Sequence, residues 1–153
     1  LEDLYTGYRQ NVMAADEIVA FIDVPLPAPG ELLRAYKVSK RQDDDISAVC
    51  LVLMLTLVDG TVQHASIGAG GVAATPARAR QAEAVLAGRA WTAEAATAAG
   101  LALQDEFQPI SDMRASGGYR RALLARLLRR FWLESQGLQQ VSLDTLSLAE
   151  ETA

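Results

Sequence analysis

Cysteine and histidine are nearly absent from this sequence, which has one of each among its 153 residues, Cys50 and His64. A single cysteine cannot form an internal disulfide, and a single histidine cannot by itself make a zinc site. The four thiolates that an iron–sulfur cluster usually needs are also lacking. Cys50 lies in an apolar run, which is typical of an inert, packed thiol. Any redox centre that this chain serves must therefore be an organic cofactor or belong to another domain.

Basic residues and long apolar runs are scarce as well. The 14 Lys and Arg residues against 19 Asp and Glu give a formal net charge of -5, so no nucleic-acid partner is expected. The longest apolar run, AVCLVLMLTLV at residues 48–58, is shorter than the roughly 18 residues of a membrane span. The opening LEDLYTGYRQ lacks the pattern of a secretory signal. These absences predict a cytoplasmic protein without a membrane partner.

The first half of the chain carries the pattern of β-strands. We expect strands at residues 17–24, 32–38, 48–58 and 61–67. Asp59-Gly60 between the last two is a strong hairpin signal, and the proline-rich LPAPG after the first is a stiff connection. The expected sheet is therefore mostly antiparallel.

After Gly71 the apolar period changes to about 3.6 residues, which predicts helices. Thr75 as N-cap and Pro76 at the first helical position predict a helix that ends at Gly88. A second helix is expected from Trp91-Thr92 to about residue 107, and a third over about residues 118–136. A run of strands followed by a run of helices indicates an α+β sandwich, an antiparallel sheet of three to four strands covered by about three helices. We expect one domain over residues 1–137 and a partly ordered tail over residues 138–153.

The third helix is expected to be amphipathic. Its core face is predicted to carry Tyr119, Leu123, Leu124, Leu127, Leu128, Phe131 and Trp132. Its solvated side is predicted to carry Arg120, Arg121, Arg126, Arg129 and Arg130.

Two motifs suggest chemistry that their surroundings do not support. GAGGVA at residues 68–73 fits a dinucleotide-binding pattern, but the expected helix begins too late, and no acidic residue ends a second strand about 20 residues on. We interpret it as a turn whose small residues allow close packing. His64 lies beside a hairpin and no G-x-S-x-G motif accompanies it, so a structural or exposed role is favoured over catalysis.

The segment AYKVSKRQDDDISAV at residues 35–49 carries an unusual density of charge for a connection between two strands. It is either a solvated loop or part of a functional site. The residues by themselves favour the solvated loop and supply no complete catalytic set.

Four blocks of the sequence resemble, in the same order, the C-terminal domain of the FAD-binding subunit of bacterial xanthine dehydrogenase, a molybdenum hydroxylase. They are TGYRQNVMAADEIVAFIDVP, YKVSKRQDDDISAV, GAGGVAATPARARQAEAVLAG and PISDMRASGGYRRALLARLLRRF. Together they span most of the chain, and the last two are the most specific. The resemblance implies the sandwich of the CO dehydrogenase flavoprotein C-terminal domain.

The resemblance also implies a role in electron flow. In that family, electrons from xanthine or hypoxanthine pass from a molybdenum cofactor through iron–sulfur clusters to FAD, and reduced FAD gives hydride to NAD. The implied partners are a preceding FAD-binding domain that holds most of the flavin, an iron–sulfur domain and a molybdenum-binding subunit. By itself, this chain is expected to hold little FAD and to be inactive.

Several residues match functional positions of the family. Lys37 matches a flavin-contacting lysine, and Val19 matches an apolar residue near the cofactor, although a plain sheet-core role for Val19 is an equal alternative. Residues 38–48 match a loop beside the flavin. The charged residues of this loop, expected near flavin and NAD with the two basic ones holding the carboxylates, are Lys40, Arg41, Asp43, Asp44 and Asp45.

A second hypothesis belongs to a different functional class. The domain would serve as a non-catalytic assembly module of a related molybdenum hydroxylase, of the CO dehydrogenase or aldehyde-oxidising type. Its helices and basic face would then join the flavin domain to other parts, and changing Lys37 would leave the flavin unperturbed.

Overall fold

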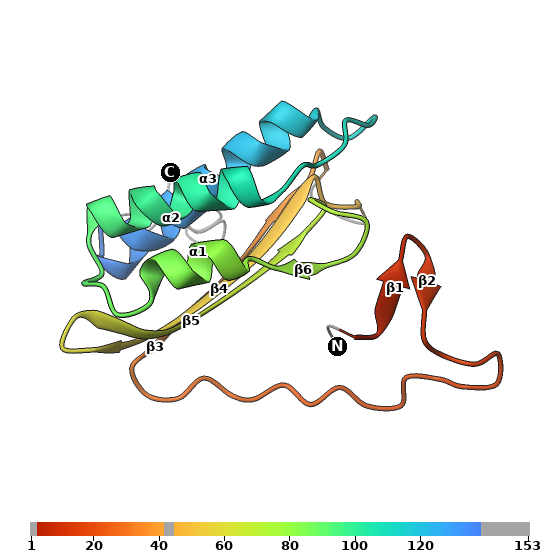
Figure 1. The fold of residues 1–153 in the computed structure, drawn as a ribbon, viewed down its shortest axis with the longest axis horizontal. Coiled ribbons are helices and arrows are strands. Elements are labelled where there is room, and N and C mark those ends of the chain that lie inside the picture. Colours follow the sequence, from red (N-terminus) through yellow and green to blue (C-terminus); the bar gives the residue numbers. More distant parts are fainter. Residues whose placement is uncertain (1–2, 42–44, 139–153) are drawn as a thin grey trace, which may run out of the picture.

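The computed structural model of the protein describes residues 3–41 and 45–138. Its main body is a two-layer sandwich, in which an antiparallel sheet of order β3-β4-β5-β6 carries the helices on one face (Figure 1). The elements are β3 (Glu31–Val38), β4 (Val49–Val58), β5 (Thr61–Gly70), β6 (Ala77–Arg78), α1 (Arg80–Leu86), α2 (Ala93–Glu106) and α3 (Gly117–Ser135). The predicted α+β class and the helix-covered antiparallel sheet are confirmed.

The central strand β4 determines both faces of the sheet. Its side chains alternate, so that Leu51 and Leu55 are fully buried beneath the helices while Val52, on the other face, is 40% exposed. At the end of β4, Asp59 and Gly60 form the hairpin turn to β5 with positive φ angles of 49° and 72°. This is the turn that the Asp-Gly pair predicted.

The first helix begins later than the Thr75-Pro76 signal predicted, and that prediction is wrong. Ala77–Arg78 instead form the short strand β6 beside β5. The N-terminal end of α1 is capped from another helix, because the Glu106 carboxylate at the end of α2 accepts a hydrogen bond from the Gln81 amide at 3.1 Å. A cap supplied by a distant residue leaves no signal in the local sequence.

The second helix begins as predicted. The Thr92 hydroxyl accepts a hydrogen bond from the Ala95 amide at 3.2 Å, which makes Thr92 the N-cap. Farther along α2, a Cβ at Gly100 would lie 3.3 Å from the Cβ of Ala125. Small residues therefore let α2 and α3 approach closely above the sheet.

The third helix is a core helix, as predicted, but two of its residues lie on the unexpected side. Leu124, Leu128 and Phe131 are buried. Tyr119, predicted in the core, is 48% exposed, whereas Arg120, predicted on the solvated basic side, is only 4% exposed. Arg120 precedes Leu124 by about one helical turn and therefore shares its buried face.

The C-terminal end of α3 is held against β3 by a polar contact. The Tyr36 hydroxyl donates a hydrogen bond to Glu134 at 2.7 Å, and the Arg130 guanidinium lies over the Tyr36 ring at 5.1 Å from its centroid. Burial, together with the hydrogen bond to Glu134, raises the pKa of Tyr36. This contact fixes the helix over the strand that carries Lys37.

The N-terminal part differs most from expectation. Residues Tyr5–Gly7 (β1) and Gln10–Asn11 (β2) form a small hairpin that was not predicted. The strand predicted at residues 17–24 is wrong, because this segment is extended but lies outside any strand. It runs on the side of the sheet away from the helices (Figure 1). Alternation produces a strand only where a neighbouring backbone pairs with it, and the described part of the chain offers that segment no such strand.

Two further expectations concern the whole chain. Within the two described ranges, no helix has both the length and the apolar character needed to cross a membrane. The domain boundary after residue 137 and the partly ordered tail remain predictions, because residues 139–153 lie outside the described part.

The adjacent glycines at the start of α3 provide a test of the packing. A Cβ at Gly117 would collide with the Pro109 carbonyl oxygen, whereas a Cβ at Gly118 would meet nothing within 4 Å. We expect Gly117→Ala to lower the free energy of unfolding by about 1 to 3 kcal/mol through overpacking. Gly118→Ala is the matched control and should be neutral or stabilising by up to about 1 kcal/mol. Urea unfolding measures both, and equal effects would contradict this packing.

Candidate functional site

The open face of the sheet, opposite the helices, carries Lys37. This lysine is exposed and stands in register with Cys50 of β4, which pairs in turn with Gly70 of β5. In the adjacent row, Val52 pairs with Gly68, where a Cβ would meet nothing within 4 Å. These positions present small and apolar groups with a cation at one end.

The charged segment, residues 38–48, connects β3 to β4 directly after Lys37. Its base is closed by a hydrogen bond from the Ala48 amide to the Val38 carbonyl at 2.7 Å. Within it, the Asp45 carboxylate accepts the Arg41 amide at 3.2 Å and pairs with the Arg41 guanidinium at 3.7 Å. Burial by itself raises the pKa of Asp45, but the amide and charge of Arg41, together with the amides of Ile46 and Lys40, outweigh it and lower this pKa. The predicted pairing of Arg41 with a carboxylate of this segment is therefore confirmed.

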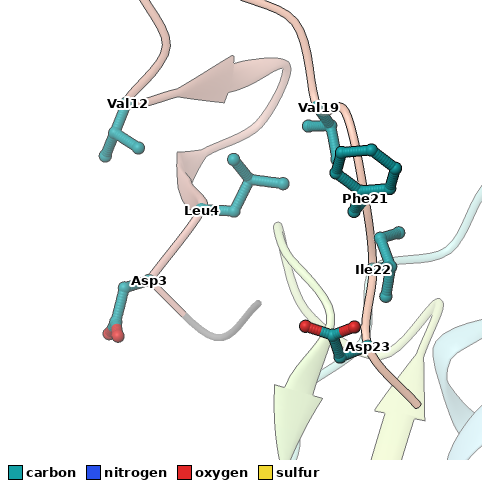
Figure 2. Close-up of a pocket in the computed structure, with 7 residues that line it drawn as sticks. All are labelled: Asp3, Leu4, Val12, Val19, Phe21, Ile22 and Asp23. Carbon is teal, nitrogen blue, oxygen red and sulfur yellow. The ribbon is translucent and has the colours of Figure 1, made fainter.

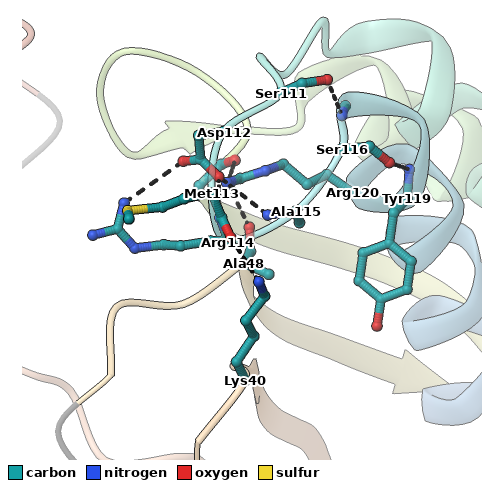
Figure 3. Close-up of polar contacts among 12 residues, drawn as sticks. Lys40, Ala48, Ser111, Asp112, Met113, Arg114, Ala115, Ser116, Tyr119 and Arg120 are labelled. Atoms are coloured by element: carbon teal, nitrogen blue, oxygen red, sulfur yellow. Dashed lines mark hydrogen bonds and ion pairs between the residues drawn. The ribbon is translucent and has the colours of Figure 1, made fainter.

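Lys40 makes a different contact from the predicted one. Its Nζ donates a hydrogen bond to the Met113 carbonyl oxygen at 2.6 Å, which ties the segment to the connection between α2 and α3 (Figure 3). Asp43 and Asp44, the other predicted carboxylates, lie outside the described residues.

The buried Arg120 joins three segments beneath this region (Figure 3). Its Nη1 donates to the Ala48 carbonyl at 2.8 Å and to the Gly71 carbonyl at 2.7 Å. Its Nη2 donates to Asp112 Oδ1 at 2.6 Å. The end of the charged segment, the turn after β5 and the connection before α3 thus meet at one guanidinium.

The Asp112 carboxylate is held by several donors. It accepts the backbone amides of Arg114 at 2.8 Å and Ala115 at 3.1 Å. These amides, outweighing a small burial cost and assisted by Arg120, lower the pKa of Asp112 to about 2. Asp112 is therefore ionised at neutral pH and gives Arg120 a fixed counter-charge.

The glycine turn after β5 is shaped for this contact. Gly71 has a φ of +79°, and a Cβ there would lie 2.6 Å from the Ala48 carbonyl oxygen and 3.3 Å from Arg120 Nη1. The interpretation of the GAGGVA motif as a turn that needs small residues is confirmed at Gly71.

Val19 lies in the extended N-terminal segment and is 46% exposed. With Leu4, Val12 and Phe21 it lines an open hollow between the small hairpin and the extended segment (Figure 2). The hollow is bordered by Asp3 and Asp23. Because residue 19 is outside the sheet, the alternative of a sheet-core role for Val19 is wrong. Its match to a residue near the cofactor remains a prediction.

Two residues considered for chemistry have ordinary positions. His64 is exposed on β5, as expected of a residue without a catalytic role. Cys50 is half-buried on the open face, so its thiol is less enclosed than its apolar surroundings suggested.

Sequence reasoning missed Arg120 and Asp112. The signal for Arg120 was present in the spacing to Leu124, Leu127 and Phe131, which places all of them along one helical stripe. The presence of other arginines around it hid this signal. Asp112 has no comparable pattern, because its role depends on a loop conformation.

The residues of the open face fit one wall of a flavin site. A lysine suits an anionic flavin or its phosphates, and Val52 with Gly68 offers a small, apolar surface for a ring. Among the residues described, no group of three or more metal-ligating side chains is brought together.

Comparison with curated proteins finds relatives among molybdenum-dependent hydroxylases. The chain is 34% identical over 139 residues to a nicotinate hydroxylase of Emericella nidulans, covering 86% of the chain and 10% of that protein. It is 30% identical over 148 residues to the xanthine dehydrogenase/oxidase of Gallus gallus, covering 94% of the chain and 11% of that protein. The medium subunit of nicotine 6-hydroxylase of Paenarthrobacter nicotinovorans is 30% identical over 134 residues, covering 88% of the chain and 46% of that subunit. The chain thus spans less than half of each of these relatives.

Solved structures have the same fold. CO dehydrogenase from Oligotropha carboxidovorans superposes with a TM-score of 0.76 at 29% identity, covering 84% of this chain and 45% of the matched chain. Carbon monoxide dehydrogenase from Hydrogenophaga pseudoflava gives a TM-score of 0.76 at 30% identity, with 84% and 44% covered.

The profile of the CO dehydrogenase flavoprotein C-terminal domain matches residues 34–135, from β3 to the end of α3. This range contains the open sheet face, the charged segment and the Arg120 contacts. The sequence blocks, the sandwich and the profile agree, and the chain belongs to the CO dehydrogenase flavoprotein C-terminal domain family of the molybdenum hydroxylases.

Proposed function

We propose that this domain completes the flavin site of an NAD-dependent xanthine dehydrogenase in the cytoplasm. Electrons from xanthine or hypoxanthine would leave a molybdenum centre, pass iron–sulfur clusters and reach FAD held mainly by a preceding domain. FAD, when bound, accepts these electrons and passes hydride to NAD. The domain itself would contribute one wall of the site and the charge around it.

The position of Lys37 is the observation that carries the proposal. It is exposed on the sheet face that the helices leave open, at the end where the charged segment begins. The extended segment with Val19 runs on the same side of the sheet (Figure 1). Both predicted cofactor-facing residues are thus available to a domain that approaches this side.

The lysine and the aspartates beside the open face would have different roles. Lys37 would stabilise negative charge on the reduced flavin or its phosphates, because opposite charges at contact distance attract strongly at a partly desolvated site. Asp45 and the neighbouring Asp43 and Asp44 would repel anions. They would thereby influence how the NAD phosphates approach.

The alternative is the non-catalytic assembly module. It is favoured by the exposed apolar side chains of the extended segment, since Ile18, Phe21 and Leu26 are 84%, 90% and 90% exposed. Exposed apolar side chains that follow one another along a segment are suited to burial against another domain. In this alternative the open face would touch no flavin.

The substrate is tested with the complete enzyme that carries this domain. We expect xanthine or hypoxanthine to drive NADH formation, and nicotinate, nicotine and carbon monoxide to give none. Absorbance at the NADH band measures each rate. Turnover with nicotinate but not xanthine would reject the proposed substrate while leaving the flavin role intact.

A substitution of Lys37 tests the flavin contact. In the complete enzyme, Lys37→Met should weaken FAD retention about tenfold or lower the flavin potential by about 30 mV, which corresponds to about 1.4 kcal/mol. Reduction of the molybdenum centre by xanthine should be nearly unchanged. Arg126→Met removes the same charge from the exposed side of α3 and should change neither quantity. Normal flavin content and potential in Lys37→Met would favour the assembly module.

The carboxylates of the charged segment have a separate effect. Replacing Asp44 and Asp45 by Asn should change NAD reduction several-fold, because their charge acts on the approaching phosphates. Xanthine-driven reduction of a dye that takes electrons upstream of the flavin should stay the same. The control pair Glu94→Gln and Asp105→Asn lies on α2, on the helical side. Wild-type rates with both acceptors would make the segment a solvated connection only.

A further inference from the structure

Arg120 is a buried charge whose contacts join three separate segments of the chain. Arg120 is 4% exposed, and its guanidinium donates hydrogen bonds to the Ala48 and Gly71 carbonyl oxygens and to the Asp112 carboxylate. Burying a charge is costly unless it is paired and hydrogen-bonded. The two Nη atoms of Arg120 are hydrogen-bonded, whereas its buried Nε has no hydrogen-bond partner. The hydrogen bonds lie where the segment beside Lys37 returns to the sheet.

We propose that Arg120 and Asp112 are positioning residues that hold the two described parts of the charged segment, residues 38–41 and 45–48, in place beside the flavin. The inference rests on the proposed function and assigns to the two residues an indirect role. They act through the backbone at Ala48, which ends the segment.

The guanidinium is suited to this role by its shape. Nη1 is shared between two carbonyl oxygens from different strand ends, while Nη2 is directed at Asp112 (Figure 3). A planar fork keeps these directions fixed, whereas a lysine ammonium is a flexible point charge. Arg120→Lys would therefore keep the charge but lose the geometry.

Asp112 fixes the guanidinium in turn. Its carboxylate is oriented by the amides of Arg114 and Ala115 and reaches Arg120 Nη2 at 2.6 Å. Asp112 belongs to the connection between α2 and α3, and the same connection offers the Met113 carbonyl to Lys40. The charged segment is thus attached to one support at two places, near its start through Lys40 and at its end through Ala48.

The test uses the complete flavin-loaded enzyme and two readouts. Hydrogen exchange of the Ala48 amide, which donates to Val38, reports how firmly the segment is held. The flavin reduction potential reports whether that position matters to the cofactor. The variants are Asp112→Asn and Arg120→Lys, with Asp105→Asn and Arg126→Lys as exposed controls.

Exchange at Ala48 should rise about tenfold in Asp112→Asn and Arg120→Lys, as expected when a charge-assisted hydrogen bond is lost. The hairpin turn at Asp59 should exchange as in the parent. The flavin potential should shift in both variants, and the controls should leave both readouts unchanged. Because Asp112 is on the surface, Asp112→Asn keeps the test valid even where Arg120→Lys fails to fold.

Parent-like exchange in Asp112→Asn would overturn the inference. So would faster exchange with an unchanged potential, provided that Lys37→Met shifts the potential. If Lys37→Met and Asp112→Asn both leave the potential unchanged, the proposed flavin contact itself fails. The two failures are therefore distinguishable.

Discussion

A sheet with apolar residues on both faces, of which the described helices cover only one, is the constraint behind the rest of this structure. In β4, Leu51, Leu53 and Leu55 lie under the helices, while Val52 and the half-buried Met54 lie on the open face. Strands with one apolar face need one partner layer, and strands with two need a second. The helices supply the first. Relatives in which this domain occupies less than half of the chain have further parts that could supply the second.

The charges of the domain are distributed according to these two faces. On the helical side, buried polar groups have polar partners, as Tyr36 with Glu134 shows at one end of α3 and Arg120 with Asp112 at the other. On the open side, Lys37 is exposed. In the charged segment, Arg41 and Asp45 pair at 3.7 Å, and solvent screens this interaction because the Arg41 side chain is 76% exposed. The polar pairs at the two ends of α3 stabilise the packing of this helix, whereas the exposed Lys37 is available to a ligand or to another domain.

The connection between α2 and α3 links these two systems. It supplies Asp112 to the buried guanidinium and the Met113 carbonyl to Lys40. Gly117 begins α3 where a larger residue would meet Pro109. The connection between α2 and α3 therefore determines where α3 begins, and it also binds the charged segment through Lys40.

Local signals in the sequence determined much of this fold. The apolar run at residues 48–58, the Asp-Gly turn and the Thr92 cap act over a few neighbouring residues, and each produced the element it predicted. Resemblance in four blocks predicted the family. Tertiary structure alone decided the rest. Glu106 caps α1 from another helix, residues 17–24 remain unpaired for want of a neighbouring strand, and Arg120 is buried because carbonyl oxygens from two distant turns meet it. These outcomes depend on which groups come together in space, and no short stretch of sequence contains that information.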